Sequence, residues 1–173
     1  MKTLVLGGVK SGKSRYAEQL ASQSPHPVTV IATALALDEE MRQRIAQHKA
    51  DRPDHWSVLE VPLQLSEALQ SLSSESDIKH CVIIDCLTLW LSQLCSEDVA
   101  PPSLEQHRQM LVKAVLDYHG DVIMVSNETN MGVIPMGELS RVFCDQAGLL
   151  HQALAEVCDS VTLVVAGLPQ QLK

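Results

Sequence analysis

Short apolar runs alternate with longer segments of helical spacing along the chain. A continuous apolar run is typical of a strand that is covered on both faces of its sheet. Runs of this kind, rich in Val and Ile, occupy residues 3–6, 28–32, 81–85, 122–126 and 161–166. Residues 58–61, just before Pro62, form a candidate sixth strand, which we expect at the edge of the sheet.

The segments between these runs have the apolar spacing of helices. They span residues 13–22, 38–49, 65–72, 104–118 and 139–157. Strands that alternate with helices predict an α/β fold, a three-layer sandwich with a mainly parallel central sheet and helices on both faces. The polar stretches 71–79 and 96–103 are predicted to be surface connections, so residues 1–173 are expected to form a single domain.

Composition narrows the class of protein. The chain is 46% apolar, and its 13 basic and 21 acidic residues give a net charge of −8. The apolar share is that of a folded domain, and a negative chain without a basic cluster argues against nucleic acid as a partner. No apolar run approaches the roughly 20 residues that cross a bilayer, and no signal pattern begins the chain. An anionic ligand would have to be held by local donors.

The cysteines indicate a reducing environment. Their number is odd and no C-x-x-C pair occurs, which argues against a disulfide framework or a zinc site. We therefore expect reduced thiols and a cytoplasmic protein. The five cysteines are Cys81, Cys86, Cys95, Cys144 and Cys158.

A phosphate-binding motif follows the first predicted strand directly and satisfies G-x-x-x-x-G-K-[ST]. Its glycines allow backbone N–H groups to turn inward around a phosphate, and the next helix adds its positive N-terminal end. Lys13 would reach the β- and γ-phosphates, and the hydroxyl of Ser14 would bind Mg²⁺. The motif predicts a nucleoside triphosphate site of the P-loop NTPase type. Its residues are Gly7, Gly8, Val9, Lys10, Ser11, Gly12, Lys13 and Ser14.

A second acidic group is expected beside the metal of such a site. Asp85 follows three apolar residues at the carboxyl end of a central strand, where open α/β sheets bind their ligands. We predict that Asp85 is the carboxylate on the magnesium side. The alternative is that it caps a helix beginning at Leu87.

Further motifs occur in order from residue 3 to the C-terminus. With the phosphate loop, the set resembles the bifunctional adenosylcobinamide kinase / adenosylcobinamide-phosphate guanylyltransferase family of cobalamin biosynthesis. The motifs are IATA at 31–34, DxEMxxRIxxH at 38–48, RPxxW at 52–56, DCLTLW at 85–90, SNE at 126–128, MGVIP at 131–135, SRxFxDxxG at 140–148 and VVAGLP at 164–169.

The resemblance implies two reactions on one domain. In the first, a nucleoside triphosphate, ATP or GTP, phosphorylates the hydroxyl of the aminopropanol arm of adenosylcobinamide. In the second, GTP transfers GMP to an enzyme histidine and releases pyrophosphate, and the phosphorylated corrinoid then attacks this GMP to give adenosylcobinamide-GDP. The resemblance also implies a homotrimer with substrate sites near subunit contacts.

It further implies a set of nucleotide contacts. Thr33, Lys49, Arg52 and Glu60 match positions that surround guanine, ribose and phosphate in the family. Arg52 is the candidate for countering phosphate charge, and Glu60 could accept hydrogen bonds from ribose or guanine. The alternatives are a solvated loop cation and an exposed carboxylate at a strand end.

The histidine that carries GMP is where this chain departs from the family. Relatives often have two adjacent histidines after Arg-Ile-x, but here the first is Gln47, which cannot form the covalent intermediate, and only His48 remains. A neutral imidazole is nucleophilic near pH 7, and its phosphoramidate can pass the nucleotide on. At about 100° per residue, His48 shares the predicted inward face of its helix with Met41 and Ile45. A change of nucleophile would need the helix to end or rotate near Gln47.

Three interpretations of these histidines remain. His48 is the nucleophile; or His48 only contacts GTP or supports the structure, and guanylyl transfer is impaired; or His55, beside Trp56, takes the role. A kinase without guanylyl transfer and a nucleotide-switched binding module are the corresponding alternatives for the whole chain.

The family match favours a functional role for the loop from SNE to Pro135, which could cover the corrinoid; the alternative is a simple reversal of the chain. Arg141 and Asp145, four residues apart, predict a surface ion pair. Trp56 and Trp90 are expected to pack in the core or at a subunit interface. Surface or capping positions are expected for His26, His80, His107, His119 and His151.

Overall fold

A computed structural model of the chain describes residues 1–36, 38–50, 52–74, 79–96 and 103–173. Within these ranges the strands are β1 (Lys2–Gly7), β2 (Val28–Ala32), β3 (Ser57–Glu60), β4 (Cys81–Asp85), β5 (Asp121–Asn127), β6 (Ser160–Val165) and β7 (Leu168–Gln171). The helices are α1 (Lys13–Ser22), α2 (Glu39–Ala50), α3 (Leu65–Ser74), α4 (Leu87–Ser96), α5 (Leu104–Asp117) and α6 (Glu138–Val157).

The strands form one sheet in the order β3-β2-β4-β5-β1-β6-β7. All neighbouring strands are parallel except β6 and β7, which pair as an antiparallel hairpin. The register places Gly7 beside Asn127 and Val164, and Ala32 beside Asp85. The carboxyl ends of the six parallel strands therefore meet at one edge of the sheet, which is the edge where such sheets bind ligands.

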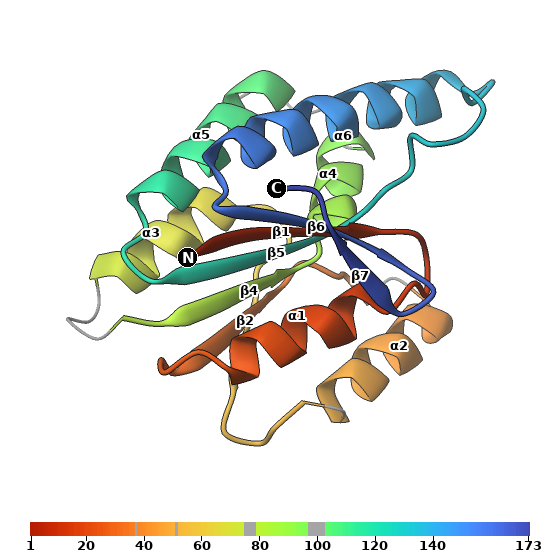
Figure 1. The fold of residues 1–173 in the computed structure, drawn as a ribbon. Coiled ribbons are helices and arrows are strands. Elements are labelled where there is room, and N and C mark those ends of the chain that lie inside the picture. The colour runs from red at the N-terminus through yellow and green to blue at the C-terminus, as the bar shows by residue number, and fades with distance from the viewer. Residues whose placement is uncertain (37, 51, 75–78, 97–102) are drawn as a thin grey trace.

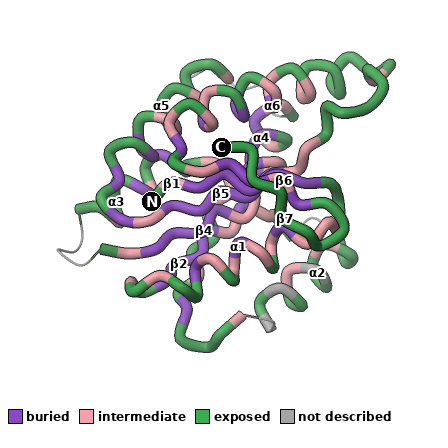
Figure 2. The backbone as a smooth tube through the Cα atoms, viewed as in Figure 1, coloured by how far each residue is buried: buried purple, intermediate pink, exposed green. Residues whose placement is uncertain are grey.

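Helices cover both faces of the sheet, as the alternation of strands and helices predicted (Figure 1). Helix α1 packs beneath β1, β4, β5 and β6, while α3, α4, α5 and α6 form a layer on the opposite face. Successive strand residues point to opposite layers: Leu4 and Leu6 belong to the larger apolar cluster, and Val5 belongs to the cluster with α1. The central strands are buried along most of their length, with half-buried residues at their ends (Figure 2).

Two elements were not among the predicted ones. Helix α4 buries Leu87, Trp90, Leu91 and Leu94, which are three and four residues apart as on one face of a helix, but this Leu-rich segment was not among the predicted helices. Strand β7 has no buried residue and contains Pro169; it forms because the edge of β6 offers a partner after a turn in which Ala166 and Gly167 have positive φ.

Other expectations are confirmed where the structure describes the residues. Trp56 and Trp90 are buried, and the Trp90 indole N–H donates to the carbonyl of Leu63 at 2.7 Å. All five cysteines are free thiols. Of the predicted connections 71–79 and 96–103, residues 71–74 instead continue α3 and Ser96 ends α4, whereas residues 75–78 and 97–102 lie outside the described residues. None of the described helices has both the length and the apolar character needed to cross a bilayer.

Candidate functional site

The phosphate loop joins β1 to α1 at the carboxyl edge of the sheet. Its backbone turns with positive φ at Lys10 and Gly12, and the Ser11 N–H donates to the carbonyl of Gly8 at 3.2 Å. From the other side, the Gly167 N–H of the β6–β7 turn donates to the carbonyl of Ser11 at 2.8 Å. A Cβ on Gly7 would lie 2.6 Å from the carbonyl oxygen of Val164. Glycine at position 7 is therefore required by close packing, and the loop shape is fixed by its neighbours.

Lys13 is held inside this loop. Its side chain is buried, and Nζ donates to the carbonyl of Gly8 at 3.0 Å. Burial lowers the pKa of Lys13, and the neighbouring Cys86 and Asp85 oppose that shift. The ammonium group thus lies at the mouth of the loop, where its hydrogen-bond acceptor is a backbone carbonyl rather than an anion.

Asp85 ends β4 beside the loop, and the structure pairs it with Arg52. Arg52 Nη2 donates to Asp85 Oδ2 at 3.3 Å, and Arg52 Nε lies 3.7 Å from Glu18 Oε1 on α1. Both Arg52 and Asp85 are largely buried, at 9% and 16% side-chain exposure. The two residues expected near phosphate and metal therefore lie together, 33 positions apart in sequence, and neutralise each other's charge.

Thr33 links the ends of β2 and β4 beneath this pair. It is fully buried, and Oγ1 both accepts from the Cys86 N–H at 2.9 Å and donates to the Cys86 carbonyl at 2.7 Å. Its own N–H donates to the Asp85 carbonyl at 3.2 Å, and its carbonyl accepts from the Gln93 side chain at 2.7 Å. The Thr33 hydroxyl is therefore committed to the backbone, where it positions Asp85.

Helix α2 carries the histidine position. It runs without interruption from Glu39 to Ala50, so the helix does not end near Gln47. Gln47 is exposed, whereas Met41 and Ile45 are half-buried, as the predicted inward face requires. His48 belongs to the helix, but its side chain lies outside the described residues.

The other predicted nucleotide contacts are exposed. Glu60 ends β3 beside Ala32 of β2, at the same edge of the sheet as the phosphate loop. Lys49 is exposed on α2, which lies on the α1 side of the sheet (Figure 1). His55 is exposed in the turn before β3. Lys49 and Glu60 therefore lie on accessible surface, and the structure does not assign either of them to a part of the nucleotide.

A buried polar chain was missed by sequence reasoning. The Nε2 atom of His151 and the Oγ atom of Ser126 are 2.8 Å apart, and Ser126 Oγ lies 3.3 Å from Thr88 Oγ1. Thr88 Oγ1 also accepts from the Asn127 N–H at 2.7 Å, and Glu128 Oε2 lies 3.7 Å from His151 Nδ1. This carboxylate favours the tautomer with its proton on Nδ1. The chain connects α4, β5 and α6.

The surface or capping position expected for His151 is wrong. The residue is 7% exposed, and burial lowers its pKa, with the carboxylate of Glu128 opposing the shift. The apolar spacing of Ala147, Leu150 and Leu154 places His151 on the inward face of the helix, and that spacing was the available signal.

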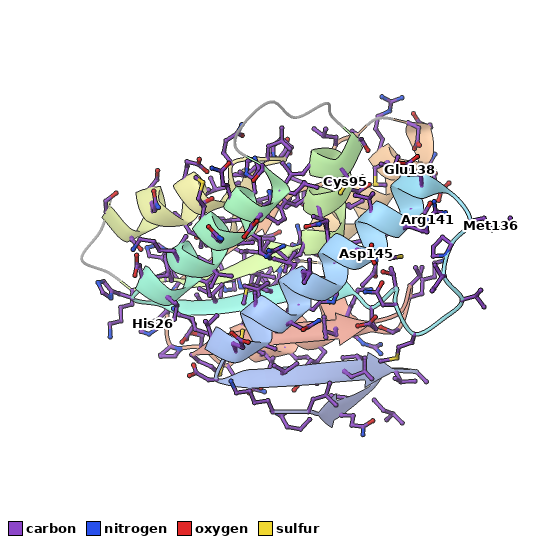
Figure 3. All side chains as sticks on the ribbon, turned by 90° about the horizontal axis from the view of Figure 1, so that it is seen from above. His26, Cys95, Met136, Glu138, Arg141 and Asp145 are labelled. Atoms are coloured by element: carbon purple, nitrogen blue, oxygen red, sulfur yellow. The ribbon has the colours of Figure 1, made fainter. Side chains whose placement is uncertain are left out.

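The segment after β5 bounds a cavity of about 870 Å³ together with α6. Arg141 holds this segment, because Nη1 donates to the carbonyls of Pro135, at 3.3 Å, and Met136. Arg141 is thus a clamp on the loop rather than the predicted partner of Asp145, which lies on the cavity wall. Figure 3 shows Met136 at the outer edge of the loop and Arg141 and Asp145 along α6.

Comparisons with known proteins agree with this architecture. A family model described as cobinamide kinase / cobinamide phosphate guanyltransferase matches residues 3–172. The bifunctional adenosylcobalamin biosynthesis protein CobP of Pseudomonas aeruginosa is 51% identical over 173 residues, which cover 100% of this chain and 98% of the relative. CobU of Salmonella typhimurium, a bifunctional adenosylcobalamin biosynthesis protein, is 35% identical over 185 residues, with 100% of both chains covered.

Solved structures support the fold alone. The protein PH0250 of Pyrococcus horikoshii superposes with a TM-score of 0.54 at 14% identity, over 99% of this chain and 85% of that one. The KaiC-like protein PH0186 of the same organism superposes with a TM-score of 0.51 at 13% identity, over 94% of this chain and 69% of that one. The fold is therefore of the P-loop NTPase type, as the phosphate motif predicted.

Proposed function

Because the chain belongs to the cobinamide kinase / cobinamide phosphate guanyltransferase family, we propose that it catalyses two consecutive steps of cobalamin biosynthesis. It phosphorylates the aminopropanol hydroxyl of adenosylcobinamide and then converts the product to adenosylcobinamide-GDP. The observation that carries this proposal is the formed phosphate loop, with buried Lys13 at its mouth and Asp85 beside it. A loop of this kind is built to hold a triphosphate for transfer.

In the kinase step, the loop residues hold and orient the triphosphate. The N–H groups of the loop surround the phosphate oxygens, and Nζ of Lys13 exchanges the carbonyl of Gly8 for a phosphate oxygen. The acceptor hydroxyl oxygen forms a bond to the γ-phosphorus. The bond from that phosphorus to the nucleoside diphosphate breaks, and the hydroxyl proton is released. Lys13 stabilises the charge on the transferring group, so positioning and electrostatics supply most of the acceleration.

Ser14 and Asp85 are the residues that would hold Mg²⁺ in this step. Mg²⁺ usually takes one or two protein ligands, with phosphate oxygens and water completing its shell. A hydroxyl at the start of α1 and a partly accessible carboxylate at the end of β4 fit that donor set. When bound, the ion neutralises charge on the phosphates. Arg52, which now pairs with Asp85, would keep the carboxylate oriented.

In the guanylyl step, His48 is the proposed nucleophile. Its imidazole nitrogen forms a bond to the α-phosphorus of GTP, and the bond to pyrophosphate breaks. A phosphate oxygen of the phosphorylated corrinoid then attacks the same phosphorus, and the nitrogen–phosphorus bond breaks to regenerate histidine. Support comes from the chemistry of the imidazole and from the resemblance to the family; the unbroken helix α2 is the observation against a change of nucleophile, because it does not end near Gln47. His55, an exposed residue, is the alternative carrier.

A kinase that has lost guanylyl transfer is the second candidate function. The observation that favours it is Gln47, which stands in α2 where relatives often have a histidine. Both candidates are cytoplasmic enzymes, in keeping with five free thiols.

The deciding experiment incubates the full chain with cobinamide, Mg²⁺ and either ATP or GTP and identifies products by mass spectrometry. The proposed function predicts a product heavier by one phosphoryl group with at least one nucleotide, and a GDP-linked product with GTP. A phosphorylated product alone would support the kinase-only candidate. Nucleotide binding with no new corrinoid product would indicate a nucleotide-switched binding module and contradict both enzymes.

A further inference from the structure

We infer that the cavity between residues 129–135 and α6 binds the corrinoid acceptor and directs its hydroxyl-bearing arm to the phosphate loop. The inference rests on the proposed function, which supplies the identity of the acceptor. The cavity volume of about 870 Å³ is near the upper end of the roughly 300–1,000 Å³ typical of small-molecule sites. A site of this size suits a macrocycle better than a small acceptor.

The cavity walls combine two kinds of side chain. Val133 and Ile134 from the loop and Leu149 from α6 supply apolar surface, while Asn130 and Gln152 supply amide groups. A corrin ring has a broad apolar face and carries amide arms around its rim. The apolar wall can cover the face of the ring, and the side-chain amides can both donate to and accept from its arms.

The charges of the cavity disfavour a nucleotide. Arg141 is the one cation among the residues that line it, and Asp145 is the one anion. The Arg141 guanidinium already donates to the carbonyls of Pro135 and Met136. A triphosphate requires several convergent donors, which the phosphate loop has and this cavity lacks. A ligand rich in neutral amides has no such requirement.

A short segment connects the cavity to the phosphate loop. The Glu128 N–H donates to the carbonyl of Gly7, the first residue of the loop, at 3.0 Å. Glu128 Oε1 accepts from the Asn130 N–H at 2.7 Å, and Asn130 Nδ2 donates to the carbonyl of Cys144 on α6 at 2.9 Å. The cavity wall therefore begins one residue, or roughly 3.5 Å of chain, after the residue that bonds to the loop. An arm leaving the cavity on this side meets the site of phosphoryl transfer.

The experiment measures cobinamide binding to the full chain by equilibrium dialysis, with MgGTP binding measured in parallel. Leu149→Glu places an unpaired carboxylate on the apolar wall, and Leu116→Glu makes the same change on α5, where the leucine is 56% exposed. We expect Leu149→Glu to weaken cobinamide binding about tenfold or more, since it removes one leucine contact and desolvates a charge. GTP affinity stays within about twofold of the original in both variants, and Leu116→Glu binds cobinamide normally.

A second variant guards against a folding defect in the first. Gln152→Glu preserves side-chain size but removes the amide donor, and we expect about threefold weaker cobinamide binding. Unchanged cobinamide affinity in Leu149→Glu would overturn the site. So would a loss of cobinamide and GTP affinity together in Leu149→Glu, if Gln152→Glu changed neither. If the unsubstituted chain neither binds nor phosphorylates cobinamide, the proposed function itself is contradicted. That result differs from unchanged binding in the variants, which contradicts only the location of the site.

Discussion

The Nζ atom of Lys13 is the most directly testable group of the phosphate loop. It is buried, donates to the Gly8 carbonyl, and lies close enough to Asp85 for that carboxylate to oppose the lowering of its pKa. Because the loop shape depends on backbone bonds at Ser11 and Gly167 rather than on this side chain, removing the ammonium group should leave the loop intact.

We therefore expect Lys13→Ala to reduce the kinase rate by about a hundredfold or more, with the fold preserved. The measurement is initial rate of cobinamide phosphorylation, with circular dichroism as the check on folding. Lys113→Ala, which removes an exposed lysine from α5, is the matched control. A Lys13→Ala rate within about tenfold of the original would remove this residue from its catalytic role.

The buried imidazole of His151 should make the stability of the fold depend on pH. Burial lowers its pKa in the folded chain, with Glu128 opposing the shift. Below the ordinary histidine pKa of about 6.5, the unfolded chain thus binds more protons than the folded one. The free energy of unfolding contributed by this residue is therefore full above that pH and falls as the pH decreases.

Replacing His151 with Gln should make the stability curve flatter between about pH 7.5 and pH 5. Urea unfolding midpoints across that range give the slope, which is the relevant quantity even if the variant is less stable at every pH. His119→Gln removes an exposed histidine and serves as the control. Parallel curves for His151→Gln and the original chain would show that the buried imidazole does not titrate differently in the fold.

At the residue scale, local structure could be predicted where a motif is contiguous in sequence, and contacts could not be predicted where they depend on how strands pair. The phosphate loop could be read directly, because its glycines and Lys13 follow one strand in a fixed spacing. The pairing of Arg52 with Asp85 could not be read, since it depends on the turn before β3 approaching the end of β4. Thr33 was expected near a nucleotide, but its hydroxyl bonds to the Cys86 backbone. This contact, too, depends on strand pairing, because it joins the residues that follow β2 and β4.

At the scale of elements, the extent of helix α2 bears on the choice between the candidate histidines. A change of nucleophile from position 47 to His48 would need the helix to end or rotate near Gln47. The helix does not end there, since α2 continues to Ala50. The unbroken helix therefore counts against a change of nucleophile, and labelling with GTP is needed to decide whether His48 acts.

We expect incubation with radiolabelled GTP to give an acid-labile protein adduct that His48→Ala abolishes and His55→Ala retains. The adduct is measured after denaturing gel filtration at neutral and acid pH. Survival of the label in His48→Ala would exclude this histidine, and its loss only in His55→Ala would assign the role to the turn before β3. No adduct in the original chain, together with normal phosphorylation, would identify a kinase without guanylyl transfer.

The helices and strands could be predicted where the apolar residues of each follow the pattern of that element. The five apolar runs became β1, β2, β4, β5 and β6, and the predicted edge strand became β3. Helix α4, which packs against β5 and α6, was missed although its buried residues have the spacing of one helix face. Strand β7 has no apolar pattern because all of its residues are exposed. It forms because the edge of β6 is free to pair with it, which the sequence does not show.

At the scale of the whole molecule, one region of the described surface carries several exposed apolar side chains. The loop after β5 and the first turns of α6 project beyond the sheet and are exposed along their length (Figures 1 and 2). Their apolar side chains are unusually accessible: Met131 is 74% exposed, Val133 and Met136 are each 96% exposed, and Leu139 is 56% exposed. Contiguous apolar surface of this kind is typical of a protein–protein interface.

The homotrimer implied by the family resemblance would cover this region and, with it, the open side of the corrinoid cavity. We expect light scattering on the full chain to give a mass of three subunits, and Met136→Asp combined with Leu139→Asp to shift the mass towards one subunit by placing unpaired carboxylates in the contact. Leu116→Asp, on the exposed side of α5, should leave the mass unchanged. If the trimer closes the cavity, cobinamide affinity should fall with the mass, whereas MgGTP affinity at the loop should not. A single-subunit mass for the original chain would contradict the assembly, and a trimer that survives both aspartates would place its contacts elsewhere.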